Sequence, residues 1–414
     1  MAPPTPAPAS SAGLIAVQPA TPRIVRRAAD WLLGLPVWAQ ALVVFLVSRI
    51  IAFAFLSHVL AEQGSSPWTS GEATTLRDFL NFWDAGWYER IATEGYPEVL
   101  PRAETGDVSQ NAWAFYPLHP WIARDVSVLT GLDYQFVSPL LSNLFAAGAA
   151  IVILALFRRH TTAGRALMGL AVVFVFPASP ILSTGYAEAL NLLLLACALT
   201  LVIDRAYLWA IPVVVAMDLS RPIGVAFSFF MLIHLISRFA RRGSDPYPEG
   251  EAIRSWTLGM LSCVAALIHP IHAWLRTGEP LAYLETEHAW SGGHSRFVIQ
   301  WFDMSRWLAG DIIGPVLLVA LIIGFAALMA SAAGRQLGRD LQHFTVAYAV
   351  YLFIFFNPQT STFRLLLPLF PLALAMAYSR SWAYRGLLLV VLIVTQYLWI
   401  SQLWHFTPPS DWPP

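Results

Sequence analysis

Long apolar stretches recur along this chain, and they restrict what it can fold into. Of its 414 residues, 57% are hydrophobic and only 12% are charged, whereas an average soluble domain carries roughly 25% charged residues. A soluble fold of this length could not bury so much apolar surface. The 25 basic and 25 acidic residues balance, so we expect no nucleic-acid partner. These features predict an all-α polytopic membrane protein.

Eleven segments are apolar enough to cross a bilayer, which takes about 20 residues in a helix. Four prolines at positions 177, 180, 212 and 222 interrupt the block 166–238, where a broken or re-entrant helix is an alternative. The predicted spans are about 38–60, 135–157, 166–183, 187–203, 206–220, 222–238, 254–275, 311–333, 341–357, 364–379 and 385–404.

The arginines give this arrangement an orientation. All basic residues are arginine, and positive charge collects on the cytoplasmic side of membrane proteins. With the N-terminus inside, fifteen arginines fall on the cytoplasmic side and seven outside. We therefore predict a cytoplasmic N-terminus and an extracytoplasmic C-terminus. The predicted organisation is a disordered tail (1–30), one transmembrane domain (31–405) and a short outer tail (406–414).

Two outer loops, 61–134 and 276–310, are long, and the first is acidic. Within it, DFLNFWDAGWYERIATEGYP (78–97) has aromatic residues at helical spacing and ends in Gly95 and Pro97. This pattern predicts one amphipathic helix lying at the membrane surface. Asp84 lies among those aromatic residues, so partial desolvation would suit its carboxylate to accept a proton. An ordinary surface aspartate is the alternative interpretation.

A second motif, NAWAFYPLHPW (111–121), follows in the same loop. Together, FWDAGWYERIATEGYP and AFYPLHP resemble the family of the second mannosyltransferase of GPI-anchor synthesis and its bacterial relatives. Tyr116 stands where that family more often has phenylalanine. The resemblance continues through the segments STGYAEAL with Tyr186 and Glu188, SRPIG with Arg221, GEPLAYLETEHAW (278–290) and STFRLLLPLFP with Arg364.

The resemblance implies a GT-C glycosyltransferase fold and a hexosyltransferase activity. It implies a polyprenyl-phosphate-mannose donor, inversion at the anomeric carbon and an extracytoplasmic active site. Asp84 falls on the family's loop aspartate, which makes it the expected catalytic base. The arginine-only composition favours a bacterial plasma membrane, where the acceptor would be a glycolipid or envelope glycan. The acceptor itself stays open, and the hypothesis treats the chain as a monomer.

Arginines inside or beside the spans are costly in lipid and need partners. A guanidinium matches a phosphate in shape, so the candidate donor-phosphate ligands are Arg364, Arg221, Arg49 and, in the AFYPLHP turn, His119. A purely structural pair, such as Arg49 with Glu188, is the alternative. The candidate substrate-binding residues are Trp83, Trp87, Tyr88, Tyr116, Tyr186, Glu188, Glu285, His288 and Trp290.

We predict no cofactor and no metal, because His269 and His272 lack a full ligand set. No Walker or dinucleotide-binding glycine motif occurs either. Three other functions remain open at this point. They are a transporter or flippase of a lipid-linked sugar, a GT-C transferase using another sugar such as arabinose, and a non-catalytic scaffold subunit.

Overall fold

The computed structural model describes residues 23–291, 297–408 and 414. The regular secondary structure of this part is entirely helical, and its one β feature is an isolated bridge between Arg102 and Val108. The predicted all-α polytopic class is confirmed. The first helices are α1 (Arg23–Gly34), α2 (Val37–Leu60), α3 (Leu76–Phe79), α4 (Ala85–Thr93), η1 (Ala112–Ala114), α5 (Leu118–Thr130), α6 (Tyr134–Arg158), α7 (Ala163–Phe174), η2 (Ser179–Ser183), α8 (Glu188–Ile203), α9 (Tyr207–Asp218) and α10 (Gly224–Ala240).

The second half continues with longer helices separated by short ones. They are α11 (Glu249–Thr277), α12 (Ala282–Trp290), α13 (Ile299–Ala309), α14 (Ile313–Ala330), α15 (Ala332–Arg335), α16 (Arg339–Phe355), α17 (Thr362–Leu365), η3 (Leu367–Leu369), α18 (Leu372–Met376), α19 (Trp382–Trp399) and η4 (Ile400–Trp404).

Each of the eleven predicted spans contains helix, but the helices differ in length. Among the described residues, five helices are long and apolar enough to cross a membrane: α2, α6, α11, α14 and the continuous stretch of α19 and η4. Four further apolar helices, α7 to α10, have 12 to 17 residues. The predicted span 364–379 is broken into α17, η3 and α18, since Pro368 and Pro371 cannot continue a regular helix.

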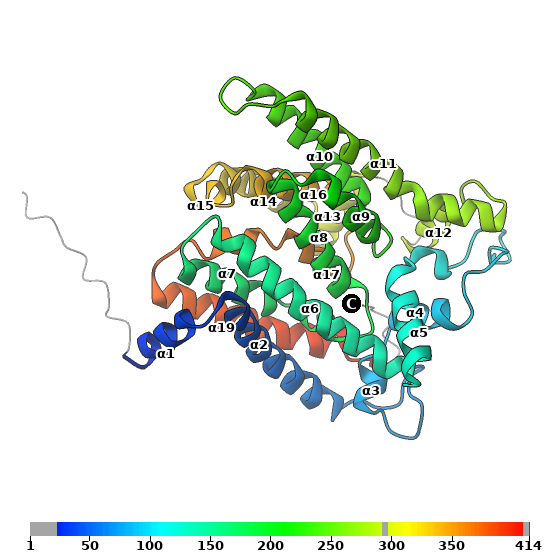
Figure 1. Ribbon diagram of the computed structural model, residues 1–414. Helices are drawn as coiled ribbons and strands as arrows, with labels where there is room; N and C mark the ends of the chain where they lie inside the picture. The colour runs from blue at the N-terminus through cyan, green and yellow to red at the C-terminus, as the bar shows by residue number, and fades with distance from the viewer. Residues whose placement is uncertain (1–22, 292–296, 409–413) are drawn as a thin grey trace, which may run out of the picture.

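Contacts between helix ends divide the bundle into two faces. Gln63 donates to the Phe406 carbonyl (2.9 Å), which joins the ends of α2 and η4 near the first loop. We call this end, which carries α3, α4, α5 and α12, the loop face. At the other end, Arg158 donates to Gln40 (2.5 Å) and Arg159 pairs with Asp204 (2.5 Å). We call that end the far face; the two lie right and left in Figure 1.

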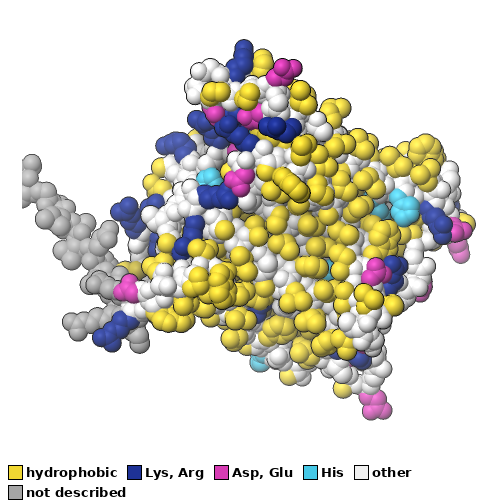
Figure 2. Space-filling view, in the orientation of Figure 1, with side chains coloured by type: hydrophobic (Ala, Val, Ile, Leu, Met, Phe, Trp, Pro, Cys, Tyr) yellow, Lys and Arg dark blue, Asp and Glu magenta, His cyan; other side chains and the backbone are white. Residues whose placement is uncertain are grey.

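The surface between these faces is apolar, as a membrane environment requires. Figure 2 shows a broad hydrophobic middle, with charged side chains gathered toward the two ends. Exposed aromatic residues flank this middle, as in the interfacial belts of membrane proteins. Trp38, Trp209, Phe239 and Trp382 lie near the far face, and Phe136, Trp274, Phe355 and Phe363 lie near the loop face.

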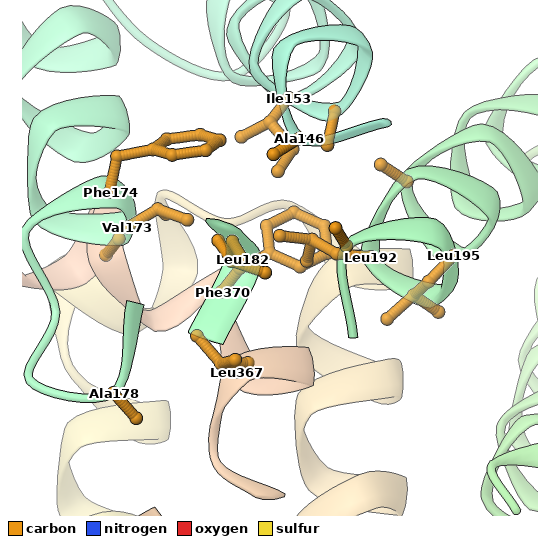
Figure 3. Close-up of a cluster of buried hydrophobic side chains, with 14 of the residues drawn as sticks. Ala146, Ile153, Val173, Phe174, Ala178, Leu182, Leu192, Leu195, Leu367 and Phe370 are labelled. Atoms are coloured by element: carbon orange, nitrogen blue, oxygen red, sulfur yellow. The ribbon is translucent and has the colours of Figure 1, made fainter. Parts of the chain in front are cut away.

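The core lies where α6, α7 and α8 meet the segment that follows Arg364. Ile153 of α6, Phe174 of α7 and Leu192 of α8 converge there with Leu367 and Phe370 (Figure 3). All five side chains are buried, and burying each contributes roughly 1.5–3 kcal/mol. This packing fixes the broken segment α17–η3–α18 against the continuous helices.

Arg49 holds the break between α7 and η2. It is buried in the middle of α2 and donates to the carbonyls of Ser179 and Phe174, both at 2.9 Å. It also donates to the Ser183 hydroxyl (3.0 Å). Both carbonyls lie at the break between α7 and η2, where Pro177 and Pro180 interrupt regular helix. Arg49 therefore bonds with the break between α7 and η2, and Glu188 is not among its partners in the described part of the chain.

Two local expectations were wrong. The single helix predicted over 78–97 is divided into α3 and α4, with five residues of non-helical turn between them. Its aromatic side chains face the protein core, since Phe82 and Trp83 are 0% and 5% exposed. In the predicted tail 1–30, residues 23–30 belong to α1, while residues 1–22 lie outside the described part.

Replacement of Arg49 by Leu should lower the free energy of unfolding by about 2–4 kcal/mol, since it removes the buried bonds to Ser179, Ser183 and Phe174. Thermal unfolding of the detergent-solubilised protein measures this loss. Arg124→Leu is the control, because Arg124 is a half-exposed residue of α5 paired only with its neighbour Asp125. A stability for Arg49→Leu equal to that of the control would contradict the role given to Arg49.

Candidate active site

A strained turn presents Asp84 at the start of α4. Trp83 has a φ of 60°, a left-handed conformation that bulky residues rarely adopt. The Trp83 indole donates to the Trp404 carbonyl (2.9 Å), and the Asp84 amide donates to the Tyr186 hydroxyl (2.9 Å). These two bonds hold the turn in place from two distant parts of the chain. The Asp84 side chain is therefore directed into the protein, where it is 5% exposed.

Four charged residues form an alternating row in the protein interior, and we call them the charged cluster. The Asp84 carboxylate pairs with Arg364 (2.5 Å), and the other terminal nitrogen of Arg364 lies 3.8 Å from Glu188. The same Glu188 oxygen accepts a bond from Arg221 (2.5 Å). All four side chains are at most 16% exposed. Two positive and two negative charges thus compensate one another where water is scarce.

Tyr186 packs against the charged cluster. The centroid of its ring lies 5.5 Å from the central carbon of the Arg364 guanidinium, within cation–π range. Its hydroxyl accepts a hydrogen bond from the Asp84 amide and donates one to the Phe82 carbonyl (3.4 Å). Tyr186 is fully buried, so it fixes the relative positions of Asp84 and Arg364 without being accessible itself.

A small pocket opens at the charged cluster on the side of α8 and α16. Two atoms there have no hydrogen-bond partner in the described part of the chain: the second carboxylate oxygen of Glu188 and the Nε of Arg364. Buried polar atoms are rarely left unpaired, so this pocket is suited to a polar group of a ligand. Its lining residues are Glu188, Asn191, Leu192, Arg221, Tyr348, Arg364, Leu365, Leu367 and Pro368.

The broken segment is what brings Arg364 to this place. Tyr348 of α16 donates to the Leu365 carbonyl (2.8 Å), which ties α17 to its neighbour. Leu367 and Phe370 anchor the following turns in the core. Arg221 is placed similarly, since Tyr351 donates to the carbonyl of Pro222 (2.5 Å). Arg364 thus lies in the short helix α17 and Arg221 on the turn between α9 and α10, and tyrosines of α16 hold both segments.

Two of the predicted phosphate ligands lie elsewhere. Arg49 is bound to the α7–η2 break, as described above. His119 is fully buried in α5, where its Nε2 bonds with the Ser138 hydroxyl (3.0 Å). Burial lowers the pKa of His119 to about 4, so its ring is neutral at physiological pH. The structure brings only Arg364 and Arg221 of that set to the charged cluster.

The predicted aromatic residues of the first loop line its interior and one open groove. Trp87 stacks on Phe115 (6.0 Å between ring centroids), and Trp290 of α12 meets both rings edge-on. Tyr88 is buried against Tyr186. Trp68, Trp83 and Trp87 line an open groove on the outer side of α4, together with Gly86, Glu89, Arg90, Thr93 and Glu94.

The second outer loop contributes α12, whose residues lie in different environments. Glu285 is partly exposed and 3.6 Å from Arg102, and His288 is exposed. Tyr116 and Tyr283 share a hydrogen bond (3.2 Å), and Tyr283 also bonds with Glu287. Burial raises the pKa of Glu287 from 4.5 to about 7, although Tyr283 and Arg221 oppose this change.

Glu287 lies between Glu285 and His288 in the segment that the sequence predicts to line the acceptor groove, and the structure adds it to the candidate site residues. The sequence contained a signal, because Tyr283 and Glu287 are four residues apart and therefore share one face of a helix. Glu285 and His288 fall on other sides of α12. Since the charge of Arg221 acts on Glu287, this carboxyl group belongs electrostatically to the charged cluster.

No metal centre is formed by the described residues, where no group of three or more His, Cys, Asp or Glu side chains is arranged to hold an ion. His269 instead bonds with the Trp113 carbonyl (2.9 Å) and packs on Tyr116.

The chain resembles solved structures in fold, but sequence comparison finds no match. No protein-family model matches the sequence, and no curated protein is similar enough to be counted as a relative. The fold is similar to the crystal structure of the Archaeoglobus fulgidus oligosaccharyltransferase complex with Zn and sulfate, with 12% identity and a TM-score of 0.49. The match covers 89% of this chain and 54% of that one. The chain therefore spans about half the length of that protein.

The raised pKa of Glu287 predicts a pH dependence of stability. Because the folded pKa is about 7 and the ordinary value is 4.5, the unfolded chain releases its proton first. Stability should therefore fall as the pH rises from about 4.5 to about 7. In Glu287→Gln this part of the fall should disappear, as measured by thermal unfolding at a series of pH values. An unchanged pH profile in Glu287→Gln would show that Glu287 titrates normally.

Proposed function

We propose that this protein is an inverting glycosyltransferase of the GT-C class that transfers mannose from a polyprenyl-phosphate donor. The acceptor would be a glycolipid or envelope glycan outside the cytoplasm, with the loop face directed outward. The pairing of Asp84 with Arg364 at 2.5 Å carries this proposal. It joins a carboxylate that can take a proton to a cation that can hold a phosphate.

The roles follow from the chemistry of the charged cluster. Arg364 and Arg221 offer terminal nitrogens to a phosphate, and a guanidinium binds phosphate through two parallel hydrogen bonds. The donor's phosphate would compete with Asp84 and Glu188 for these nitrogens. When Arg364 turns to the phosphate, Asp84 loses its partner and becomes a stronger base. Donor binding would thereby prepare the base for the acceptor.

The reaction is one displacement. Asp84 takes the proton of the acceptor hydroxyl, and that oxygen forms a bond with the anomeric carbon of the sugar. The bond between this carbon and the phosphate oxygen breaks on the opposite side, so the configuration inverts. The electron pair leaves with the polyprenyl phosphate, whose added negative charge Arg364 and Arg221 stabilise. Asp84 later returns the proton to solvent.

Several observations support the choice of donor. The small pocket at the charged cluster is lined by both arginines and by the apolar residues Leu192, Leu365, Leu367 and Pro368, which suits a phosphate attached to a hydrocarbon chain. The motifs around Asp84, Tyr186, Arg221 and Arg364 resemble mannosyltransferases that use such donors. In the structure Arg364 contacts Asp84 and Tyr186 and shares Glu188 with Arg221. Mannose and the extracytoplasmic orientation rest on that resemblance and on the arginine distribution.

Asp84→Asn should lower transfer of radiolabelled mannose from polyprenyl-phosphate mannose by about 10²–10⁴-fold, the usual contribution of a general base. The assay uses membranes that contain equal amounts of the folded variant and the native protein. Donor binding should persist in Asp84→Asn, because Arg364 and Arg221 remain.

Asp125→Asn is the matched control, since Asp125 is an exposed aspartate of α5 that pairs only with its neighbour Arg124. Its rate should equal that of the native protein. A near-native rate for Asp84→Asn at normal expression would remove Asp84 as the base. Flux of the lipid-linked sugar without a new glycosylated product would favour a transporter instead.

A further inference from the structure

A second pocket, distant from the charged cluster, opens on the far face and is rich in arginine. Four arginines from three parts of the chain line it: Arg205 after α8, Arg238 and Arg241 at the end of α10, and Arg339 at the start of α16. Two aspartates, Asp245 and Asp340, also line it. We call this hollow the far-face pocket. Arginines toward the upper left of Figure 2 belong to the same end of the molecule.

The carboxylates at this pocket already form hydrogen bonds and ion pairs with neighbouring side chains. Asp245 accepts bonds from Arg205 (2.8 and 2.9 Å) and from Arg238 (2.5 Å). The Arg205 hydrogen bonds lower the pKa of Asp245, so this carboxyl group stays charged. Beneath the pocket, buried Glu251 pairs with Arg238 (2.8 Å). These ion pairs compensate the positive charges of Arg205 and Arg238 and hold both side chains in place.

Asp340 also has a hydrogen-bond partner within the protein. Its carboxylate bonds with Nδ1 of His234 (2.7 Å), whose other ring nitrogen meets the Tyr207 hydroxyl (3.1 Å). Tyr207 in turn donates to Glu251 (3.3 Å). The floor of the pocket is therefore a connected network of buried polar groups, which favours a rigid site.

Arg241 and Arg339 are different, because neither forms an ion pair with a described carboxylate. Arg241 donates to the carbonyl and hydroxyl of Ser237 (3.2 and 3.0 Å), and Arg339 is exposed. Two guanidinium charges at the pocket thus remain uncompensated by acidic side chains. An anion with several acceptor oxygens, such as a phosphate, would satisfy both.

The position of the pocket indicates where such a phosphate would come from. Trp209 and Phe239 are exposed and lie near the same ends of α9 and α10 as the arginines. Exposed aromatic residues of this kind mark the headgroup level of a bilayer. Basic pockets between transmembrane helices at that level bind anionic lipid headgroups. Val202 and Ile203 give the pocket an apolar edge.

We propose that the far-face pocket binds the phosphate of an anionic phospholipid headgroup, with Arg241 and Arg339 as its main ligands. The site is independent of the proposed transfer reaction and would hold even if that proposal failed. It would stabilise the joined ends of α8, α10 and α16.

Thermal unfolding of the purified full chain in detergent tests this proposal. The probes are phosphatidylglycerol, phosphatidylcholine as the zwitterionic lipid, and inorganic phosphate. The variants are Arg339→Gln, whose side chain has no described bond to lose, and the double variant Arg241→Gln/Arg339→Gln. Arg335→Gln is the matched control, since Arg335 is exposed on the same face and bonds only with the Ala330 carbonyl.

Phosphatidylglycerol should raise the unfolding temperature of the native protein and of Arg335→Gln, and phosphatidylcholine should not. Its apparent affinity should fall by roughly ten-fold for each charge-assisted hydrogen bond lost in the variants. Inorganic phosphate could raise the unfolding temperature as much as phosphatidylglycerol does, and lose this effect in the same variants. That result would support a phosphate site at the far-face pocket but would show that its ligand is a soluble phosphate. No stabilisation by either phosphate source, or equal stabilisation of all variants, would overturn the proposal.

Discussion

A buried row of alternating charges, Asp84–Arg364–Glu188–Arg221, is the interaction on which the rest of this structure depends. Taking a charge out of water costs several kcal/mol unless an opposite charge and hydrogen bonds replace the lost hydration. Each member of the row has at least one such partner. Leaving any one of them unpaired would cost roughly 3–5 kcal/mol. The helices that carry them are thereby held in one arrangement.

The same row explains why several helices are short or broken. Arg364 lies in the four-residue helix α17 and Arg221 on the turn between α9 and α10, and both side chains reach Glu188. Tyr348 and Tyr351 of α16 bind the backbone of these two segments. A continuous helix would place each arginine on a fixed spiral and would not bring both to one carboxylate. Proline at positions 222, 368 and 371 favours these breaks.

Hydropathy predicted the helical class and the position of most helices. Asp84, Arg221, Arg364 and Glu188 were named as separate candidates, from charges in or beside apolar segments and from the resemblance to mannosyltransferases, and the structure places these four residues together. The sequence did not predict which charges meet, because Asp84 and Arg364 are brought together by the packing of distant helices. Local signals also failed where tertiary contacts override helical spacing. The turn at Trp83 is fixed by Trp404 and Tyr186, from far along the chain, so the spacing over 78–97 wrongly indicated one helix.

A structure of the protein with polyprenyl-phosphate mannose bound tests the central claim most directly, because it shows which partner Arg364 holds. Our account predicts that the donor's phosphate oxygens contact Arg364 and Arg221, and that Arg364 no longer pairs with Asp84. The freed carboxylate should then face the anomeric carbon from the side opposite the phosphate. A donor phosphate bound elsewhere, with the 2.5 Å contact between Asp84 and Arg364 intact, would contradict it.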